Sequence, residues 1–214
     1  IPRSVPLFAN DRLTGWSRTS KVKHVTSAAS SGDNPPVPTQ TNKQSPQDSP
    51  SVTGELLSQG VLTLLRSKQA PREHWQYSRP LLVGESIDYE FRNDSLPSIH
   101  PTFGQLAFLL GADGIRIRWL GIAKDDWVPL PPDHSLVEPL NRRGPRTLDL
   151  SANQWHRIRL ERTATGLVLS LDDTIVYERP MDWVGDQRFG LLMEQASGVA
   201  ELRQMTLRGD WPET

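Results

Sequence analysis

Polar and apolar residues alternate along much of the chain, which is the pattern of half-buried β-strands. In Glu85–Arg92, the residues Ile87, Tyr89 and Phe91 occupy every second position, and polar residues lie between them. A period of two places one set of side chains on each face of a strand. We therefore predict an antiparallel strand here, with these three apolar side chains facing the core.

Further short runs of this kind are separated by turn signals. Gln105–Leu110 and Gly114–Leu120 are joined by Gly-Ala-Asp-Gly, a β-hairpin composition. In the second run Arg116 and Arg118 alternate with apolar residues, so we expect them to point away from the core. The other predicted strands are Gly60–Arg66, Trp155–Arg162, Leu167–Leu171, Ile175–Arg179, Arg188–Glu194 and Val199–Arg208. Turn signals at intervals of about 8–12 residues, without helical periodicity, predict an all-β fold, a two-sheet antiparallel jelly-roll sandwich.

Two polar segments interrupt this series. Ser27–Ser51 is rich in Ser, Pro, Gln, Asn and Thr, so we expect a disordered or surface-draped insert. The N-terminal piece Ile1–Thr26 is too small to fold alone and is expected to dock on the main body as a strand. Lys124–Arg146 contains five prolines, which favours a long surface loop. The predicted organisation is a single β-sandwich domain over residues 1–214 with the insert at 27–51.

The composition excludes several kinds of chemistry. The 214 residues include no cysteine, which excludes disulfides, thiolate metal sites, iron–sulfur clusters and cysteine nucleophiles. The chain has 24 Lys and Arg against 25 Asp and Glu, so the net charge is −1 and the basic excess typical of nucleic-acid binding is missing. The longest apolar run, Leu106–Leu110, is too short to cross a bilayer, so no membrane insertion is expected. Because the chain begins at Ile1, we interpret it as a processed or excised piece.

Several motifs resemble known sequences. Pro6–Trp16, PLFANDRLTGW, is similar to the opening of concanavalin A-like domains of the 3-keto-disaccharide hydrolase kind, relatives of the laminin-G and legume-lectin sandwiches. Most of the chain resembles a planctomycete family of large proteins that contain such a domain. The motifs that carry this resemblance are Arg79–Leu82, Gly84–Phe91, His100–Gly104, Phe108–Leu110, Val176–Arg179, Arg188–Leu191 and Arg208–Pro212. The resemblance implies a concanavalin A-like (lectin/glucanase) sandwich. It implies little about chemistry, because that family has no established activity.

Two carboxylates are candidate catalytic residues. Glycosidases use a pair of carboxylates that converge on the scissile bond, and on related sandwiches they come from one strand. Asp88 and Glu90 share a face of their strand, whereas Glu85 points the other way, so a full set of three carboxylates is missing. The alternative is a solvated face on which both are paired with Arg116 and Arg118 of another strand.

His100 is the third catalytic candidate. It precedes Pro101 in a predicted loop that enters a strand, and catalytic or binding groups concentrate in such loops. The alternative is a histidine that caps backbone groups. The five histidines lack the spacing of a metal site. The acidic pairs, such as Asp172-Asp173, are better explained by turns than by a calcium loop. We therefore expect no metal and no other cofactor, with calcium, which lectin-type sandwiches often bind, left open as an unsupported alternative.

The candidate ligand-binding residues are aromatic or cationic. Trp75, Trp127 and Trp183 occur in polar contexts typical of loops, where an indole can stack on a sugar ring or anchor the loop. Arg118 is a further candidate ligand-binding residue, because it would line the same groove as Asp88, Glu90 and His100 if these four residues lay on one concave face. The tryptophans expected to serve as core or strand-end anchors are Trp16, Trp119 and Trp155.

Three classes of function remain open. The first is a non-catalytic carbohydrate-binding or adhesion-type module of a larger protein. The second is a glycan-active hydrolase or lyase resembling the 3-keto-disaccharide hydrolases, and the third is a structural or interaction domain without a small ligand. A glycan or polysaccharide is the expected partner of the first two classes. An extracytoplasmic location, secreted, periplasmic or at the cell surface, is expected, and the sequence does not indicate an oligomeric state.

Overall fold

The computed structural model describes residues 3–7, 13, 15–20, 54–66, 72–95, 97–120, 135–180, 185–194 and 198–210. These residues form fifteen strands in two antiparallel sheets. None of the described residues belongs to a helix long and apolar enough to cross a membrane. The predicted insert 27–51 lies outside the described residues, as do Trp127 and Trp183.

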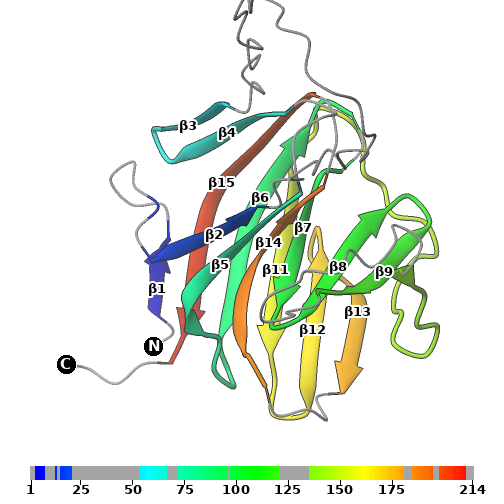
Figure 1. The fold of residues 1–214 in the computed structure, drawn as a ribbon. Helices are drawn as coiled ribbons and strands as arrows, with labels where there is room; N and C mark the ends of the chain where they lie inside the picture. Colours follow the sequence, from blue (N-terminus) through cyan, green and yellow to red (C-terminus); the bar gives the residue numbers. More distant parts are fainter. Residues whose placement is uncertain are drawn as a thin grey trace, which may run out of the picture.

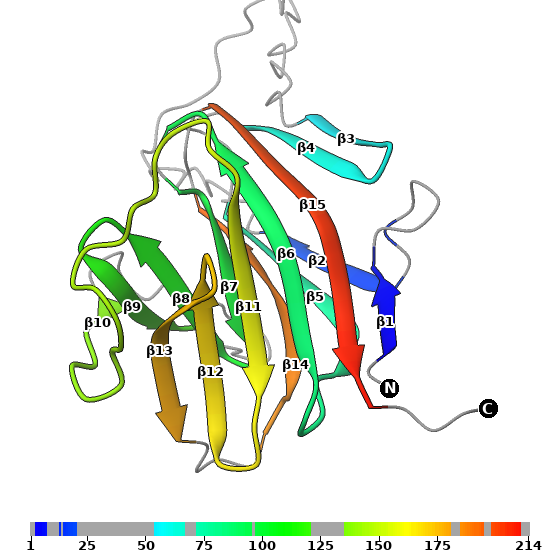
Figure 2. The same ribbon diagram turned by 180° about the vertical axis from the view of Figure 1, so that it is seen from behind.

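The eight-stranded sheet lies in front in Figure 2. Its path from edge to edge is β13 (Thr174–Pro180), β12 (Gly166–Leu171), β11 (His156–Arg162), β6 (Ser86–Asn93), β15 (Gly198–Gly209), β4 (Val61–Arg66) and β3 (Gly54–Ser58). A further strand, β1 (Arg3–Pro6), pairs with the end of β15, beyond the part of β15 that pairs with β4. Since β6 lies between β11 and β15, Asp88 is opposite Arg159 on one side and Thr206 on the other.

The seven-stranded sheet lies in front in Figure 1. Its path is β10 (Ser135–Leu136), β9 (Gly114–Trp119), β8 (Leu106–Gly111), β7 (Ile99–Phe103), β14 (Arg188–Met193), β5 (Glu73–Pro80) and β2 (Trp16–Ser20). In the middle, Gly190 of β14 is opposite Gln76 of β5 and Thr102 of β7. The same row continues through Ala107 of β8 to Arg118 of β9. Five strands thus place one residue each in a line across this sheet.

The hydrophobic core lies between the two sheets. The eight-stranded sheet contributes the predicted residues Ile87, Tyr89 and Phe91, all of which are buried. The seven-stranded sheet contributes buried side chains that include Trp75 and Phe103. Burial of this apolar surface is the main favourable contribution to folding. Because side chains alternate along each strand, the neighbours of these core residues lie on the two outer faces of the sandwich.

The N-terminal piece contributes one strand to each sheet. β1 pairs with β15 of the eight-stranded sheet, and β2 pairs with β5 of the seven-stranded sheet. The ring of Trp16 in β2 packs edge-on against Tyr77 and Phe189, with centroid separations of 5.4 and 5.9 Å. The predicted docking of this piece on the main body is confirmed, with two strands instead of one.

The structure confirms the strands that were predicted from alternation and adds others. The sequence predicts loops around Trp75 and His100, whereas these residues lie inside β5 and β7. Within the predicted loop Lys124–Arg146, the short strand β10 pairs with β9, and residues 121–134 lie outside the described part. The loop predictions come from local composition, namely the polar neighbours of Trp75 and Pro101 after His100, although polar and apolar residues alternate in both strands.

Candidate functional site

Asp88 lies on the outer face of the eight-stranded sheet, enclosed by arginines. Its side chain is 3% exposed, and its Oδ1 lies 2.9 Å from both Nη2 of Arg157 and Nε of Arg159. Nε of Arg208 lies 3.3 Å from Oδ2, and the hydroxyl of Ser86 donates to the same oxygen. Three guanidinium groups and one hydroxyl therefore occupy the carboxylate.

Glu90 is ion-paired on the same face. Its Oε2 lies 2.6 Å from Nε of Arg203. The guanidinium of Arg203 also lies over the ring of Trp155, 4.0 Å from its centroid, and Arg92 lies 4.9 Å from the same centroid. The outer surface formed by Asp88, Glu90 and these arginines is called the arginine face below. In Figure 2 the strands that carry it, β6, β11 and β15, lie next to one another.

The predicted arginine partners of these carboxylates are wrong. Arg116 and Arg118 belong to β9 in the other sheet, whereas the neighbours of β6 are β11 and β15. Arg116 instead pairs with Asp113 at 2.5 Å, and Arg118 pairs with Glu194. The sequence supplied opposite charges but no strand order, and strand order determines which charges meet.

The outer face of the seven-stranded sheet brings His74 and Thr102 together. The Nε2 atom of His74 lies 3.1 Å from Oγ1 of Thr102, although β14 runs between their strands. Gly190 makes this contact possible, because a Cβ at this position would collide with the carbonyl oxygen of Trp75 and lie 2.8 Å from Oγ1 of Thr102. Burial lowers the pKa of His74 to about 4, so its imidazole is neutral near pH 7.

His100 lies on this face, two residues before Thr102 on β7. Its Nδ1 accepts a hydrogen bond of 3.1 Å from the backbone N–H of Leu110, which fixes the ring against β8. Burial, together with the positive charge of Arg118, lowers the pKa of His100 to about 3. His74 and His100 lie on either side of Leu192 in the register of β14. Both histidines are therefore neutral, fixed hydrogen-bonding groups near pH 7.

Arg118 lies at one side of this face and takes part in a charge network. Nη1 of Arg118 donates to Oε1 of Glu194, and Nε of Arg72 donates to Oε2 at 3.1 Å. The side chain of Arg118 is 11% exposed. Burial lowers its pKa, and the charge of Arg72 acts in the same direction. One carboxylate thus holds two guanidinium groups beside the histidines.

A second polar chain of contacts lies at the Gln76 side of the face. Nε2 of Gln76 donates to Oδ2 of Asp186 at 2.9 Å. Asp186 is also held by Arg188, whose Nε and Nη2 donate to its two oxygens at 2.8 and 2.7 Å. These hydrogen bonds from Arg188 are the main reason that the pKa of Asp186 is lowered. The carboxylate is therefore ionised and held in one orientation.

Between the polar groups lies a small apolar cluster. Ala107, Leu120 and Leu192 are buried there, and Leu109 packs against them. This cluster is separate from the main core, because it lies on the opposite side of the sheet. The outer surface that consists of this cluster, His74, Gln76, His100, Thr102 and Arg118 is called the histidine face below.

The candidate residues from the sequence therefore divide between two faces. His100 and Arg118 meet on the histidine face, whereas Asp88 and Glu90 lie on the arginine face of the other sheet. The four do not line one groove. Trp75 is 2% exposed and donates from Nε1 to Glu73 at 3.3 Å, so neither face of its ring is available to a sugar. Trp119, expected in the core or at a strand end, lies at the end of β9 and is exposed.

The sequence reasoning missed several residues of the histidine face. His74, Gln76 and Thr102 were not singled out, and neither were Arg72 and Glu194. A usable signal exists in β5, where the aromatic residues Trp75 and Tyr77 alternate with polar residues in the order H-W-Q-Y-S. Among the residues that the structure describes, no group of three or more His, Asp or Glu side chains could hold a metal ion.

The arrangement of the histidine face suits binding through hydrogen bonds. Its half-buried groups are the imidazole of His74, the amide of Gln76 and Leu109, whereas His100 and Thr102 are buried, and its carboxylates are held by arginines. Such a set can donate to and accept from ligand hydroxyl groups and can pack against C–H groups. His74 and His100 are poor general acids or bases near pH 7, because an efficient catalytic group has a pKa close to the working pH and theirs are about 4 and about 3.

Comparisons with known proteins describe the chain's relatives. A family model described as a domain of unknown function, DUF1583_N, matches residues 68–214. No curated protein sequence matches the chain. Among solved structures, the exoplasmic/lumenal domain of VIP36 in its Ca2+/Man3GlcNAc-bound form is similar with a TM-score of 0.53 and 10% identity, over 96% of this chain and 88% of that chain.

A second similar structure is a Bacillus subtilis protein of unknown function with a galectin-like fold. Its TM-score is 0.51 at 10% identity, and the match covers 98% of this chain and 96% of that chain. At such identities the likeness is one of fold. With the two antiparallel sheets, it confirms the predicted fold class, an all-β jelly-roll sandwich of the concanavalin A-like, lectin/glucanase type.

Proposed function

Because the chain belongs to the DUF1583_N family, whose model assigns no function, we propose a role from the structure itself: a non-catalytic carbohydrate-binding module of a larger protein. The histidine face is the proposed binding surface. The observation that carries this proposal is the row Gln76, Gly190, Thr102, Ala107 and Arg118, in which three strands place a polar side chain on one face.

The geometry of this row supports a ligand rich in hydroxyl groups. Neighbouring strands lie about 4.8 Å apart, so the polar side chains of Gln76, Thr102 and Arg118, on alternate strands of the row, are spaced at roughly 10 Å. The absence of a side chain at Gly190 lets His74 and Thr102 come within hydrogen-bond distance across β14. Leu109, the half-buried member of the apolar cluster, is the part that a sugar's C–H groups can reach, whereas Ala107, Leu120 and Leu192 are buried.

Two observations favour binding over catalysis. The carboxylate of Asp88 is occupied by three arginines, and Glu90 is paired with Arg203. Both carboxylates lie on the arginine face, so they cannot act on one glycosidic bond together with His100 of the other sheet. The alternative of a glycan-active hydrolase rests on the resemblance of Pro6–Trp16 to 3-keto-disaccharide hydrolase domains.

The finer parts of the proposal concern setting and partners. We assign the module to an extracytoplasmic setting and to a planctomycete family, on the basis of the sequence motifs described above. The net charge of −1 favours an uncharged or mixed-charge glycan over a nucleic acid. The mannose-containing ligand named for the VIP36 structure belongs to that protein, and the glycan of this chain is to be identified by experiment.

The test is a glycan array followed by calorimetry on the best glycan, with turnover assays on 3-keto and ordinary disaccharides. Gln76→Ala should weaken binding about tenfold, as expected for the loss of a hydrogen-bonding side chain and of its support of Asp186. Gln105→Ala is the matched control, because Gln105 is exposed in the turn between β7 and β8. Its affinity should equal that of the unaltered chain.

The three classes of function give different results. Binding without turnover that depends on Gln76 and not on Gln105 supports the proposal. Turnover that Asp88→Asn or Glu90→Gln abolishes would establish the hydrolase instead. No binding to any glycan would leave the structural or interaction domain as the function.

A further inference from the structure

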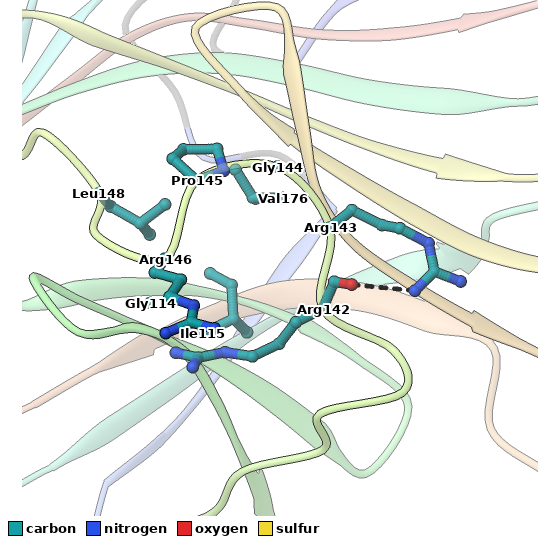
Figure 3. Close-up of a pocket in the computed structure, with 9 residues that line it drawn as sticks. All are labelled: Gly114, Ile115, Arg142, Arg143, Gly144, Pro145, Arg146, Leu148 and Val176. Carbon is teal, nitrogen blue, oxygen red and sulfur yellow. Dashed lines mark hydrogen bonds between the residues drawn. The ribbon is translucent and has the colours of Figure 1, made fainter.

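A small pocket lies at the side of the sandwich, away from the residues of the histidine face. It has a volume of about 80 Å³ and lies between the β8–β9 turn, the loop 141–148 and β13. Its lining includes Arg142, Arg143 and Arg146, together with Gly114 and Ile115. Figure 3 shows that Arg142 and Arg146 extend toward Gly114 and Ile115, whereas Arg143 extends away from them. The volume is several times the roughly 10–15 Å³ that one water needs, so a small polyatomic group fits.

The loop that carries these arginines is held by backbone hydrogen bonds on both sides. Arg143 N donates to Val176 O at 3.0 Å, and Glu178 N donates to Asn141 O at 2.7 Å, so the loop adds to the edge at β13. On the other side, Leu148 N donates to the carbonyl oxygen of Ala112 at 3.1 Å. The pocket is therefore preorganised, which reduces the entropy lost when a ligand binds.

Gly144 allows the tight course of this loop. Its φ is +64°, a conformation that residues with a Cβ rarely adopt. A Cβ at this position would also lie 2.7 Å from the carbonyl oxygen of Ile175. The glycine thus brings the loop against β13 and sets Arg142 and Arg146 on the two sides of one bend.

The charges around the pocket leave a positive excess. Arg116 pairs with Asp113 at 2.5 Å, and Arg143 pairs with Glu178 at 3.1 Å. Arg142 donates from Nη2 to the backbone carbonyl of Asp113. Within the part of the chain that the structure describes, neither Arg142 nor Arg146 forms an ion pair with a carboxylate. Two guanidinium groups in one concave site, each with N–H donors left over, attract an anion.

We propose that this pocket binds an oxyanion group, a sulfate, a phosphate or a carboxylate, between Arg142 and Arg146. The planar guanidinium fork matches the oxygens of such groups and can bind two of them at once. The group can be a free ion or a substituent of a larger ligand, and the site recognises the same chemistry in both. The proposal is independent of the histidine face.

The test is a two-dimensional NMR titration of the whole chain with sodium sulfate, phosphate or acetate, at an ionic strength kept constant with sodium chloride. The backbone amide signals of Gly114, Gly144 and Arg146 should shift and saturate. Arg142→Gln and Arg146→Gln should each weaken binding about tenfold or more, because each removes one charged partner of the anion. Arg208→Gln is the matched control, since Arg208 is a partly exposed arginine on the arginine face. Thermal melting verifies that all variants are folded.

Each outcome bears on the proposal. Saturable shifts at these amides that are lost in both pocket variants and kept in Arg208→Gln support it. Shifts that fail to saturate for all three anions, or that weaken equally in Arg208→Gln, overturn it. Glucuronate, with glucose as the uncharged control, distinguishes the two sources: tighter binding than acetate identifies a sugar substituent, and equal binding identifies a free ion.

Discussion

His74 and Thr102 are joined by a contact of 3.1 Å between Nε2 and Oγ1 that passes over an intervening strand. The strand between them, β14, presents Gly190 at the crossing point. A side chain at this position would separate the two groups and strike the backbone of β5. The histidine face therefore depends on a single residue that contributes no side chain to it.

Gly190→Ala should destabilise the fold and disrupt the histidine face. The added methyl group meets a backbone carbonyl, which cannot move without shifting β5, and overpacking of this kind costs about 1–3 kcal/mol. Urea denaturation gives the change in the free energy of unfolding. Gly111→Ala is the control, because the methyl group would crowd only the movable carboxylate of Asp113, at 2.8 Å, and would lie at an ordinary contact distance of 3.6 Å from the carbonyl oxygen of Gly114. An equal, small effect of both substitutions would contradict the role assigned to Gly190.

Acid should weaken the fold through two histidines. The pKa values of His74 and His100 are lowered from 6.5 to about 4 and about 3. In the unfolded chain these two histidines therefore take up protons near pH 6.5. In the folded chain both imidazoles stay neutral until the pH approaches 4. The contribution of the two histidines to the free energy of unfolding is fully present above pH 6.5. It decreases as the pH falls toward 4 and then 3, by up to about 1.4 kcal/mol per pH unit for each histidine.

Urea denaturation between pH 7.5 and 4.5 measures this slope. His74→Gln and His100→Gln should each make the free energy of unfolding less dependent on pH in that range. The carboxylates contribute mainly at lower pH, because the ordinary pKa of an aspartate, 3.8, lies below the range and that of Asp186 is lowered further. A slope that both variants leave unchanged would show that these histidines take up protons as readily in the folded chain as in the unfolded chain.

The fold was predictable from the sequence because alternation reports which side chains are buried. Ile87, Tyr89 and Phe91 mark one face of β6 without reference to any other strand. In contrast, the histidine face depends on strand order. His74 and Thr102 are 28 positions apart in the chain and meet only because β14, from near the C-terminus, inserts between their strands.

The same limit explains the error over Asp88. Its charge predicted arginine partners, but any of many arginines in the chain would satisfy that rule. The partners Arg157, Arg159 and Arg208 are selected by the positions of β11 and β15 on either side of β6. Charge patterns in a sequence therefore predict that a carboxylate forms ion pairs, but the strand order is needed to identify its partners.

Asp88→Asn should destabilise the fold without affecting glycan binding. The change keeps the shape of the side chain and removes the charge that three arginines share, and hydrogen bonds to charged groups contribute about 1.5–3 kcal/mol each when buried. The arginines are more than one third exposed, so solvent screening reduces the total to about 1–3 kcal/mol. Glu90→Gln is the control, with one arginine partner and a smaller expected effect. Calorimetry with the bound glycan should give unchanged affinity for both variants.

Glu194 should prove to be the link between Arg118 and Arg72. Its two carboxylate oxygens accept hydrogen bonds from both guanidinium groups, and the charge of Arg72 already contributes to the lowered pKa of Arg118. Glu194→Gln leaves two like charges facing each other beside the histidines, so we expect a loss of about 1–3 kcal/mol in the free energy of unfolding.

Adding Arg72→Gln to Glu194→Gln removes one of these charges. The double variant should therefore be more stable than the sum of the single effects predicts, with a coupling of about 0.5–3 kcal/mol. Chemical denaturation of the four proteins in the cycle measures this coupling, and strict additivity would show that Glu194 and Arg72 do not interact.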